Sequence, residues 1–233
     1  MDQLPKPEII VTHDGDLDGL LSGMLLQKLS GVLYGEEVRL LGYQTQAWHS
    51  RCLRENAAWV SDMAFEERMD RINWVIVDHH ITSATPKKAR LVHDESKSAC
   101  MLAYELCKDH GLQSESLDRL VDLANIGDLF LHESPDIEMA NDYGSLVKTY
   151  GFWNVYSIVD GNPEKLLDHP LLEVMKVKRE VEDPMGLKWS RKNIQEISPE
   201  VGLVKTVVGN SNVMDIKVNY DYLDLVDKKV FKR

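Results

Sequence analysis

The chain has 233 residues, of which 43% are hydrophobic and 28% are charged. This composition is ordinary for a globular protein, and the length suffices for one large α/β domain or for such a domain with a small appendage. The apolar runs are too short to span a bilayer, and residues 1–7 do not form a secretory signal. A formal net charge of −11 argues against non-specific binding of long nucleic acid, which requires a basic surface.

The cysteines indicate a reducing compartment. There are three of them, Cys52, Cys100 and Cys107, and none forms a C-x-x-C pair. An odd number without such a pair favours small buried thiols over disulfide bridges. We therefore expect a cytoplasmic protein.

The first half of the chain alternates apolar runs with helical patterns. Residues 8–12 form a β-branched run that ends in an acidic loop, and residues 20–29 then carry apolar side chains at helical spacing. Further strands are predicted at residues 38–43, 57–61 and 74–77. Continuous apolar strands separated by helices are typical of a parallel sheet that is covered on both faces.

The rest of the chain is predicted to be mostly helical. A strand is expected at residues 89–92, and helices at 98–108 and 117–126. Pro163, Pro170 and Pro184 are expected to interrupt the later helices. Two strands, 202–208 and 213–218, are predicted around a turn at 209–212.

These patterns predict an α/β fold. We expect a three-layer domain with a mainly parallel central sheet flanked by helices, followed by a mostly helical C-terminal segment. Residues 1–190 are assigned to this domain. Residues 191–233 are assigned to a linker and a small β-containing extension, or to an incomplete second domain.

The acidic loop after the first strand has two simple explanations that must be weighed. Asp14, Asp16 and Asp18 alternate before Gly19, as in the first half of a calcium-binding hand. The twelfth position of such a hand requires a bidentate glutamate, and here it is Leu25; the loop also enters from a strand. The calcium hand is therefore rejected, whereas an ordinary solvated acidic turn stays an alternative for the loop taken alone.

The position of the loop favours a binding site. Carboxylates at the carboxyl end of a parallel strand lie in the crevice where open α/β sheets bind ligands. Three acidic groups packed closely repel one another unless a cation compensates them, and His13 adds an imidazole. The helix start at residues 19–23, which includes Ser22, can offer N–H groups to a phosphate.

A second polar segment, Asp78-His79-His80, follows the most apolar predicted strand. Neighbouring residues of an extended segment point to opposite sides, so the two histidines should have separate roles, one on a metal ion and one facing a substrate. Asp62 and Asp128 also follow predicted elements. Each alone could be a turn residue, but four such ends in one sheet topology favour a common site.

The order of these segments resembles the DHH superfamily of phosphoesterases, which includes RecJ-like exonucleases, oligoribonucleases and phosphoadenosine-phosphate phosphatases. The resemblance covers about residues 8–130 and is carried mainly by Asp78-His79-His80 and the earlier Asp16-x-Asp18-Gly19. It implies that Asp16 and Asp18 serve two metal ions, that Asp62 bridges them, and that His79 and Asp128 complete the second site.

The resemblance also implies roles around the substrate. His80 would contact the scissile phosphate, and Asp78 would orient a neighbouring histidine. Ser98 lies in a small-residue segment that would approach the substrate. One further ligand of the first metal ion is open between two residues: we favour Asp14, with His13 as the alternative.

The expected chemistry is hydrolysis of a phosphoester by a water that two divalent cations activate. Oxygen and imidazole ligands without thiolates suit Mn²⁺ or Mg²⁺, and the imidazoles favour two Mn²⁺ ions. The expected substrate is a small phosphorylated compound such as a nucleotide or short oligonucleotide, with no long duplex nucleic acid and no membrane as partner. A pyrophosphatase or polyphosphatase, a non-catalytic regulatory module, and assembly as a homodimer stay open.

Overall fold

A computed structural model describes residues 4–198 and 201–204 of the chain. Its centre is a sheet of five parallel strands in the order β2-β1-β3-β4-β5. The strands are β1 (Ile9–His13), β2 (Leu40–Tyr43), β3 (Ala58–Ser61), β4 (Trp74–Asp78) and β5 (Arg90–His93). All residues of β3 and β4 are buried, as expected for central strands covered on both faces. The predicted mainly parallel α/β fold is confirmed.

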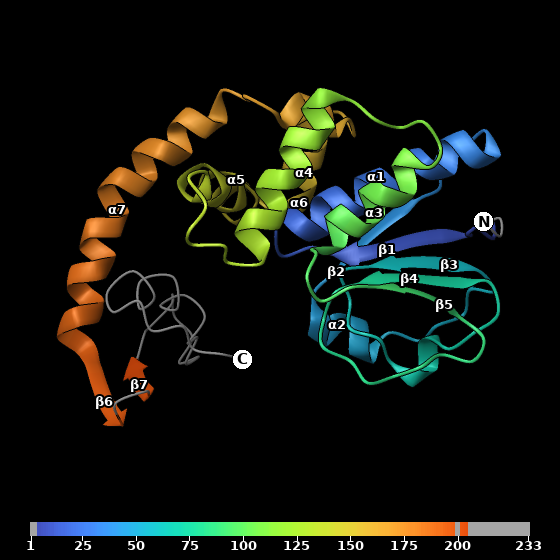
Figure 1. Ribbon diagram of the computed structural model, residues 1–233, viewed down its shortest axis with the longest axis horizontal. Helices are drawn as coiled ribbons and strands as arrows, with labels where there is room; N and C mark the ends of the chain where they lie inside the picture. The colour runs from blue at the N-terminus through green and yellow to red at the C-terminus, as the bar shows by residue number, and fades with distance from the viewer. Residues whose placement is uncertain (1–3, 199–200, 205–233) are drawn as a thin grey trace. The chain divides into compact units, whose positions relative to one another are not determined.

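Helices cover both faces of the sheet (Figure 1). On one side lie α1 (Leu17–Tyr34) and α3 (Ala99–Lys108), with α4 (Glu115–Asp128), α5 (Ile137–Tyr150) and α6 (Phe152–Ile158) beyond them. On the other side lie α2 (Thr45–Ser50) and the 3₁₀ helix η1 (Glu67–Met69). A second 3₁₀ helix, η2 (Pro163–Leu166), follows α6.

The alternation of side chains along the central strands builds two cores. Val60 and Ile76 point to the α2 face, where they pack with Trp48 of α2 and Met69 of η1. The neighbouring strand residues point to the α1 face, as a β-strand requires. There the ring of Trp59 lies 6.3 Å from that of Tyr34 on α1. The sheet is thus the middle layer of three.

Helix α1 begins where the acidic loop ends. Asp16 is its N-cap, and its side chain accepts a hydrogen bond from the N–H of Gly19. Gly35 ends the helix with φ +79°, in the left-handed region that favours glycine. Most residues of α1 are buried on all sides, since the helix lies between the sheet and the outer helices.

Several predicted bounds differ from the structure. Helix α1 extends beyond residues 20–29 at both ends, and α4 continues through Gly127 to Asp128. Pro184 lies inside α7 (Leu171–Asn193), although it was expected to interrupt a helix. Pro184 is exposed, so water can satisfy the carbonyl group whose intrahelical partner the proline removes.

The chain divides into two compact units, residues 1–172 and 173–233. In the second unit, most of α7 is followed by an antiparallel pair, β6 (Ile194–Ser198) and β7 (Val201–Val204). β7 covers the start of the predicted strand 202–208; the remainder of that strand, the turn 209–212 and the strand 213–218 lie outside the described residues. The predicted boundary at residue 190 stays a prediction. Within the described residues, no helix has the length and apolar character needed to cross a membrane.

Candidate metal centre

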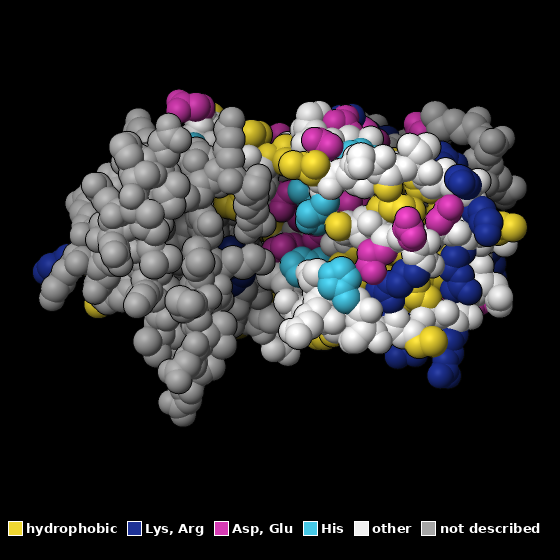
Figure 2. Space-filling view, turned by 90° about the horizontal axis from the view of Figure 1, so that it is seen from below, with side chains coloured by type: hydrophobic (Ala, Val, Ile, Leu, Met, Phe, Trp, Pro, Cys, Tyr) yellow, Lys and Arg dark blue, Asp and Glu magenta, His cyan; other side chains and the backbone are white. Residues whose placement is uncertain are grey.

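Six polar side chains from distant parts of the sequence meet at one edge of the sheet. They come from the carboxyl ends of the adjacent strands β1, β3 and β4, from the start of α1 and from the end of α4. The six are His13, Asp16, Asp18, Asp62, His79 and Asp128. Acidic and histidine side chains gather together on this face (Figure 2).

These residues and His80 form three overlapping groups among the described part of the chain. In each group, one potential ligand atom per residue lies within 4.8 Å of those of the other members. The groups are His13, Asp16 and Asp62; Asp18, His79 and Asp128; and Asp62, His79 and His80. Each sequence-predicted metal residue except Asp14 belongs to at least one group.

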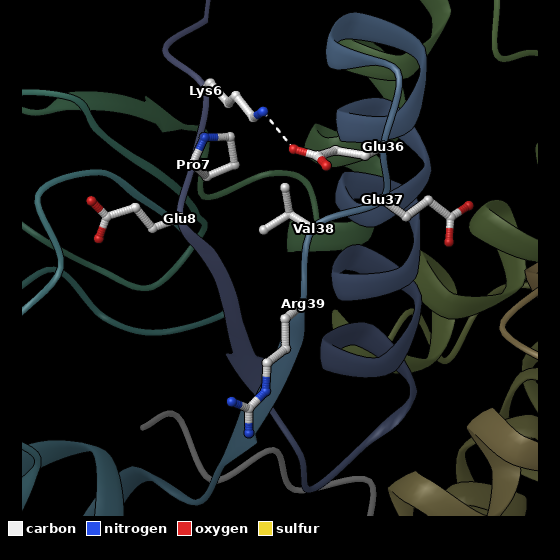
Figure 3. A pocket seen from close by; sticks show the side chains of 7 residues that line it. All are labelled: Lys6, Pro7, Glu8, Glu36, Glu37, Val38 and Arg39. Carbon is white, nitrogen blue, oxygen red and sulfur yellow. Dashed lines mark ion pairs between the residues drawn. The ribbon is translucent and has the colours of Figure 1, made fainter.

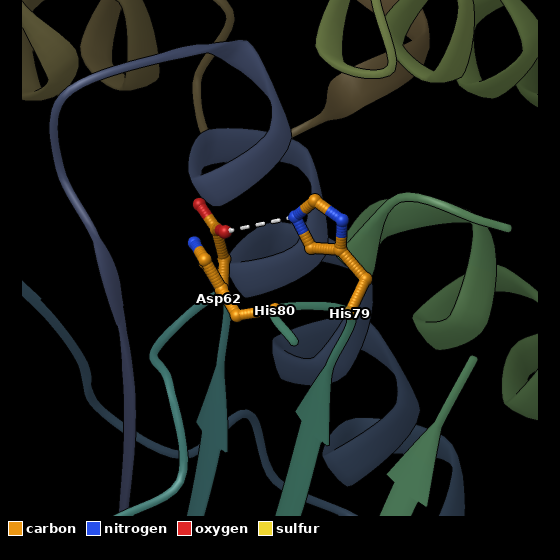
Figure 4. A group of neighbouring side chains, drawn as sticks. All are labelled: Asp62, His79 and His80. Atoms are coloured by element: carbon orange, nitrogen blue, oxygen red, sulfur yellow. Dashed lines mark ion pairs between the residues drawn. The ribbon is translucent and has the colours of Figure 1, made fainter. Parts of the chain in front are cut away.

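Asp62 belongs to the first and third groups, and His79 joins the third group to the second. Its Oδ2 lies 3.5 Å from Nδ1 of His13, and its Oδ1 lies 3.7 Å from Nε2 of His79. Asp62 and His79 point toward one another from the ends of neighbouring strands (Figure 4). Asp62 has a φ of +51°, which is strained for a residue with a side chain, and such strain is concentrated at functional sites. The backbone turn therefore places this carboxylate between the two histidines.

Backbone N–H groups at the start of α3 bind the carboxylate of Asp18. Its two carboxylate oxygens accept hydrogen bonds from the N–H groups of Ala99, at 2.8 Å, and Cys100, at 2.7 Å. Asp18 is nevertheless completely buried beside other acids. Burial, followed by the charges of Asp62 and Asp16, raises the pKa of its carboxyl to about 7.

Asp128 completes the second group from the last residue of α4. Its Oδ2 lies 3.3 Å from Nε2 of His79. Burial and the nearby charge of Asp18 raise the pKa of Asp128 to about 9, against the opposing effect of His79. The raised pKa thus reflects a carboxyl group that is buried close to other acidic side chains.

The two histidines of the centre respond to the same excess of negative charge. Burial lowers the pKa of His13, but the neighbouring carboxylates of Asp16 and Asp62 outweigh that effect and raise it to about 10. For His79, burial is likewise outweighed by Asp62, Asp128 and Asp18, and its pKa rises to about 9. In both cases the raised pKa results from carboxylates gathered around the imidazole.

The residues fit divalent cations. Oδ2 of Asp62 and Oδ2 of Asp128 are buried and have no hydrogen-bond partner among the described residues. Buried polar atoms are rarely left in this state unless an ion or water satisfies them. Because the donors are carboxylate oxygens and imidazole nitrogens without a thiolate, the set suits Mn²⁺ or Mg²⁺.

Asp78 and His80 form a separate pair beside this centre. Asp78 is fully buried; its Oδ1 lies 2.7 Å from Nδ1 of His80, and its Oδ2 accepts the N–H of His80 at 3.2 Å. The hydrogen bond that the imidazole donates to Asp78 raises the pKa of His80, although burial opposes it. Nε2 of His80, on a half-exposed ring, is left for another partner.

The structure does not bring Asp14 into the cluster, although the sequence favoured it over His13. Consecutive residues at the end of β1 point in different directions, so His13 turns toward Asp62 while Asp14 turns away. Oδ1 of Asp14 accepts a hydrogen bond from Nε2 of Gln44. Asp14 belongs to none of the candidate metal groups within the described residues.

The side chains of Ser22 and Ser98, for which substrate contacts were predicted, are both buried. The Ser22 hydroxyl donates to Oγ of Ser61 at 3.0 Å. Ser98 is the N-cap of α3 and accepts the N–H of Met101. Both hydroxyls form hydrogen bonds within the fold, and their contact with a substrate stays a prediction.

Two residues that the sequence did not single out support the site. Nε2 of His93 lies 2.9 Å from the carbonyl oxygen of His80. Oδ1 of Asn125 accepts the N–H of Ser98 at 2.8 Å and so joins the start of α3 to α4. His93 ends β5 in register with Asp78, so the same rule that selected strand-end residues elsewhere could have identified it.

A hollow on the surface lies away from the metal centre and shares no residue with it. Its volume is about 520 Å³, and it lies where β1 and β2 begin, at the opposite end of these strands from the metal centre (Figure 3). It is lined by residues 6–8 and 36–39, and Lys6 and Glu36 pair across it at 2.5 Å. No side chain of the metal centre reaches this hollow.

No family model and no curated protein sequence matches the chain. Solved structures do match. A pGpG-specific phosphodiesterase, PggH, from Vibrio cholerae is 12% identical with a TM-score of 0.55; the match covers 87% of this chain and 69% of that one. The DHH domain of a protein described as a member of a ribosomal-protein family is 14% identical with a TM-score of 0.54, over 94% of this chain and 69% of that one.

A third structure, RecJ from Thermus thermophilus in complex with Mn²⁺, is 16% identical over 82% of this chain and 38% of that one. Its TM-score of 0.42 is too low to bear on the fold. The first two matches, together with the five-stranded parallel sheet and its flanking helices, show that this chain has the fold of a DHH domain.

Proposed function

We propose that this chain is a phosphoesterase that holds two divalent cations, Mn²⁺ in preference to Mg²⁺, and hydrolyses nucleotides or short oligonucleotides. The observation that carries the proposal is Asp62, whose two oxygens face the histidines of two adjoining ligand groups. When bound, two such cations activate a water for in-line attack and neutralise charge on the phosphate.

The proposed ligand assignment follows the geometry. His13 and Asp16 hold the first cation, and Asp18, His79 and Asp128 hold the second, with Asp62 shared between them. His13 takes the position for which the sequence favoured Asp14. The pairs of carboxylates that repel one another in the cation-free protein are then compensated.

His80 is proposed to face the substrate. Asp78 fixes Nδ1 of the ring, so that Nε2 can donate a hydrogen bond to a phosphate oxygen. Asp78 also raises the pKa of His80, which favours the protonated ring that this contact requires. His93, bonded to the His80 carbonyl, would hold the segment in place.

Two observations support a small nucleotide as substrate. The structural neighbour PggH is described as a phosphodiesterase specific for pGpG. The formal charge of −11 also disfavours a long polyanion, whose binding depends on a basic surface. In the proposal the substrate is therefore a nucleotide or a short single strand.

The test is hydrolysis after removal of metal with a chelator and addition of Mn²⁺, Mg²⁺ or Ca²⁺. The panel contains a linear dinucleotide, a short single-stranded oligonucleotide, a long duplex, a nucleoside monophosphate and pyrophosphate. We expect Mn²⁺-dependent cleavage of the dinucleotide and oligonucleotide. Asp128→Asn should abolish it, whereas Asp122→Asn, an exposed aspartate on the same helix, should not.

The same panel of substrates distinguishes the alternative functions, a pyrophosphatase and a non-catalytic module. Release of phosphate from pyrophosphate alone would identify a pyrophosphatase. If every substrate stays intact with every cation, the chain is a non-catalytic module and the proposal fails.

A further inference from the structure

The end of α4 has an unusual residue in its terminating turn. The N–H of Leu131 donates to the carbonyl of Ile126 at 3.0 Å, and the N–H of Phe130 donates to that of Gly127 at 3.4 Å. This pattern of hydrogen bonds ends a helix through one residue in the left-handed region, which is usually glycine. Here that residue is Phe130, with φ +53°. A large side chain therefore occupies a position where the backbone favours glycine.

Packing does not explain this choice. Phe130 is 51% exposed and the following Leu131 is 43% exposed. The ring of His132, also exposed, lies 6.3 Å from the ring of Phe130, with 38° between their planes. Two neighbouring rings are thus presented to solvent on a strained turn, and strained residues of this kind are concentrated at ligand sites.

The turn borders the metal centre. Asp128, whose Oδ2 lies 3.3 Å from Nε2 of His79, precedes Phe130 by only one intervening residue. Two residues of chain span at most about 7 Å, so the backbone of Phe130 lies within that distance of the backbone of Asp128. A ligand held by its phosphate at the centre can therefore extend over this turn.

We propose that Phe130, with His132 beside it, stacks against a nucleobase of the substrate whose phosphate lies at the metal centre. This inference rests on the proposed function and narrows its substrate to compounds that carry a base. An exposed aromatic ring stacks on any base, because every base has a π-face, and it requires no particular hydrogen-bonding edge. Pyrophosphate and polyphosphate have no group that would use it.

The kinetic test compares a linear dinucleotide with the matching dinucleotide that lacks both bases. Phe130→Ala should raise KM for the complete dinucleotide by about tenfold or more, and Phe130→Trp should restore it. The unaltered protein and Phe130→Ala should cleave the abasic compound equally well. Trp153→Ala, which removes a similarly exposed ring on α6, serves as the matched control. It should change KM for neither the complete nor the abasic dinucleotide. Equal effects of Phe130→Ala on both substrates, or no effect on either, would overturn the inference.

A binding test works without turnover and so distinguishes this inference from the proposed function. Affinity for a nucleoside monophosphate is measured by calorimetry with Ca²⁺ present, and affinity for inorganic phosphate is the reference. Phe130→Gly should raise the midpoint of thermal unfolding, because glycine relieves the strained turn, and should weaken nucleotide binding about tenfold while phosphate binding stays unchanged. An unchanged nucleotide affinity in Phe130→Gly would exclude stacking, even if the protein hydrolyses nothing.

Discussion

Oδ1 of Asp62 lies 3.7 Å from Nε2 of His79, across the ends of two neighbouring parallel strands. The other oxygen of this carboxylate faces His13 at 3.5 Å and has no hydrogen-bond partner among the described residues. A buried carboxylate that uses its two oxygens toward two different imidazoles is suited to share two cations. The sheet itself sets this relationship, because β1, β3 and β4 are adjacent and all end at the same edge.

The first prediction concerns the number of cations. Calorimetric titration with Mn²⁺ should give two bound ions for the unaltered protein and one for His13→Ala, because His13 belongs only to the first ligand group. Asp62→Asn should weaken the binding of both ions, since the shared carboxylate loses its charge. Asp14→Asn should bind two ions like the unaltered protein.

The comparison between Asp14 and His13 is decisive because the residues are adjacent. Loss of one ion in Asp14→Asn, with two retained in His13→Ala, would show that the loop binds metal through Asp14. The ligand assignment proposed above would then be wrong in its first site.

A second prediction separates Asp78 from the ligands. Asp78→Asn should lower kcat by about a hundredfold or more, because His80 loses the charged partner that orients its ring. The number of bound Mn²⁺ ions should stay at two, since Asp78 is not a member of any candidate group in the described residues. Steady-state kinetics and calorimetry on the same preparation measure both quantities. A change in KM alone, or loss of an ion, would contradict the positioning role.

The sheet and the positions of the site's segments could be predicted from the sequence. Apolar runs at residues 57–61 and 74–77 are buried on both faces, so their composition alone distinguishes them from amphipathic strands. Once these strands are parallel, their carboxyl ends must meet, which brings Asp62 near His79 without knowledge of any side-chain conformation. The strands with a continuous apolar sequence are accordingly the most predictable elements.

Side-chain directions in the loops could not be predicted in this way. The acidic loop offers both His13 and Asp14, and which of them faces the centre depends on how the chain leaves β1. Ser22 and Ser98 appear polar and available in the sequence, yet both are buried and hydrogen bonded. The short helix α2 has too few turns to produce a helical pattern and was missed. The turn after α4 has Phe130, and not glycine, at its left-handed position, so the sequence does not indicate the turn.

The third prediction uses two glycines in helices. A Cβ added to Gly19 would lie 2.0 Å from the carbonyl oxygen of His13 and 3.0 Å from Oδ2 of Asp62. The obstacle is backbone, so Gly19→Ala should lower the free energy of unfolding by at least about 2 kcal/mol and displace the ligands. Gly144 in α5 has no atom within 4 Å of such a Cβ. Gly144→Ala should instead raise the free energy of unfolding by up to about 1 kcal/mol.

Urea unfolding of the metal-free proteins measures both changes. The opposite signs distinguish close approach at the metal centre from the general effect of alanine in a helix. If Gly19→Ala were as stable as the unaltered protein, the tight contact between α1 and the end of β1 would be wrong.

The fourth prediction concerns the pH dependence of stability through Glu55, which belongs to none of the candidate metal groups in the described residues. Arg51 binds its carboxylate through two guanidinium N–H groups, one of which donates to Oε2 at 3.0 Å. This fork, against a smaller opposing effect of burial, lowers the pKa of Glu55 from 4.5 to about 2. Because the pKa is lower in the folded state, ionised Glu55 stabilises the fold above about pH 4.5, and this contribution is lost as the pH falls toward 2.

The shift from 4.5 to about 2 corresponds to at most about 3.5 kcal/mol, since one pKa unit is about 1.4 kcal/mol. Glu55→Gln should therefore lower the free energy of unfolding by up to this amount at pH 7, and the difference should shrink steadily between pH 4.5 and pH 2. Glu105→Gln is the control, because the ion pair of Glu105 with Lys97 is exposed and contributes less than about 1 kcal/mol. Urea unfolding of the three proteins across this range measures the differences. A difference for Glu55→Gln that does not change with pH would attribute its effect to packing around Arg51 and not to the ionised carboxylate.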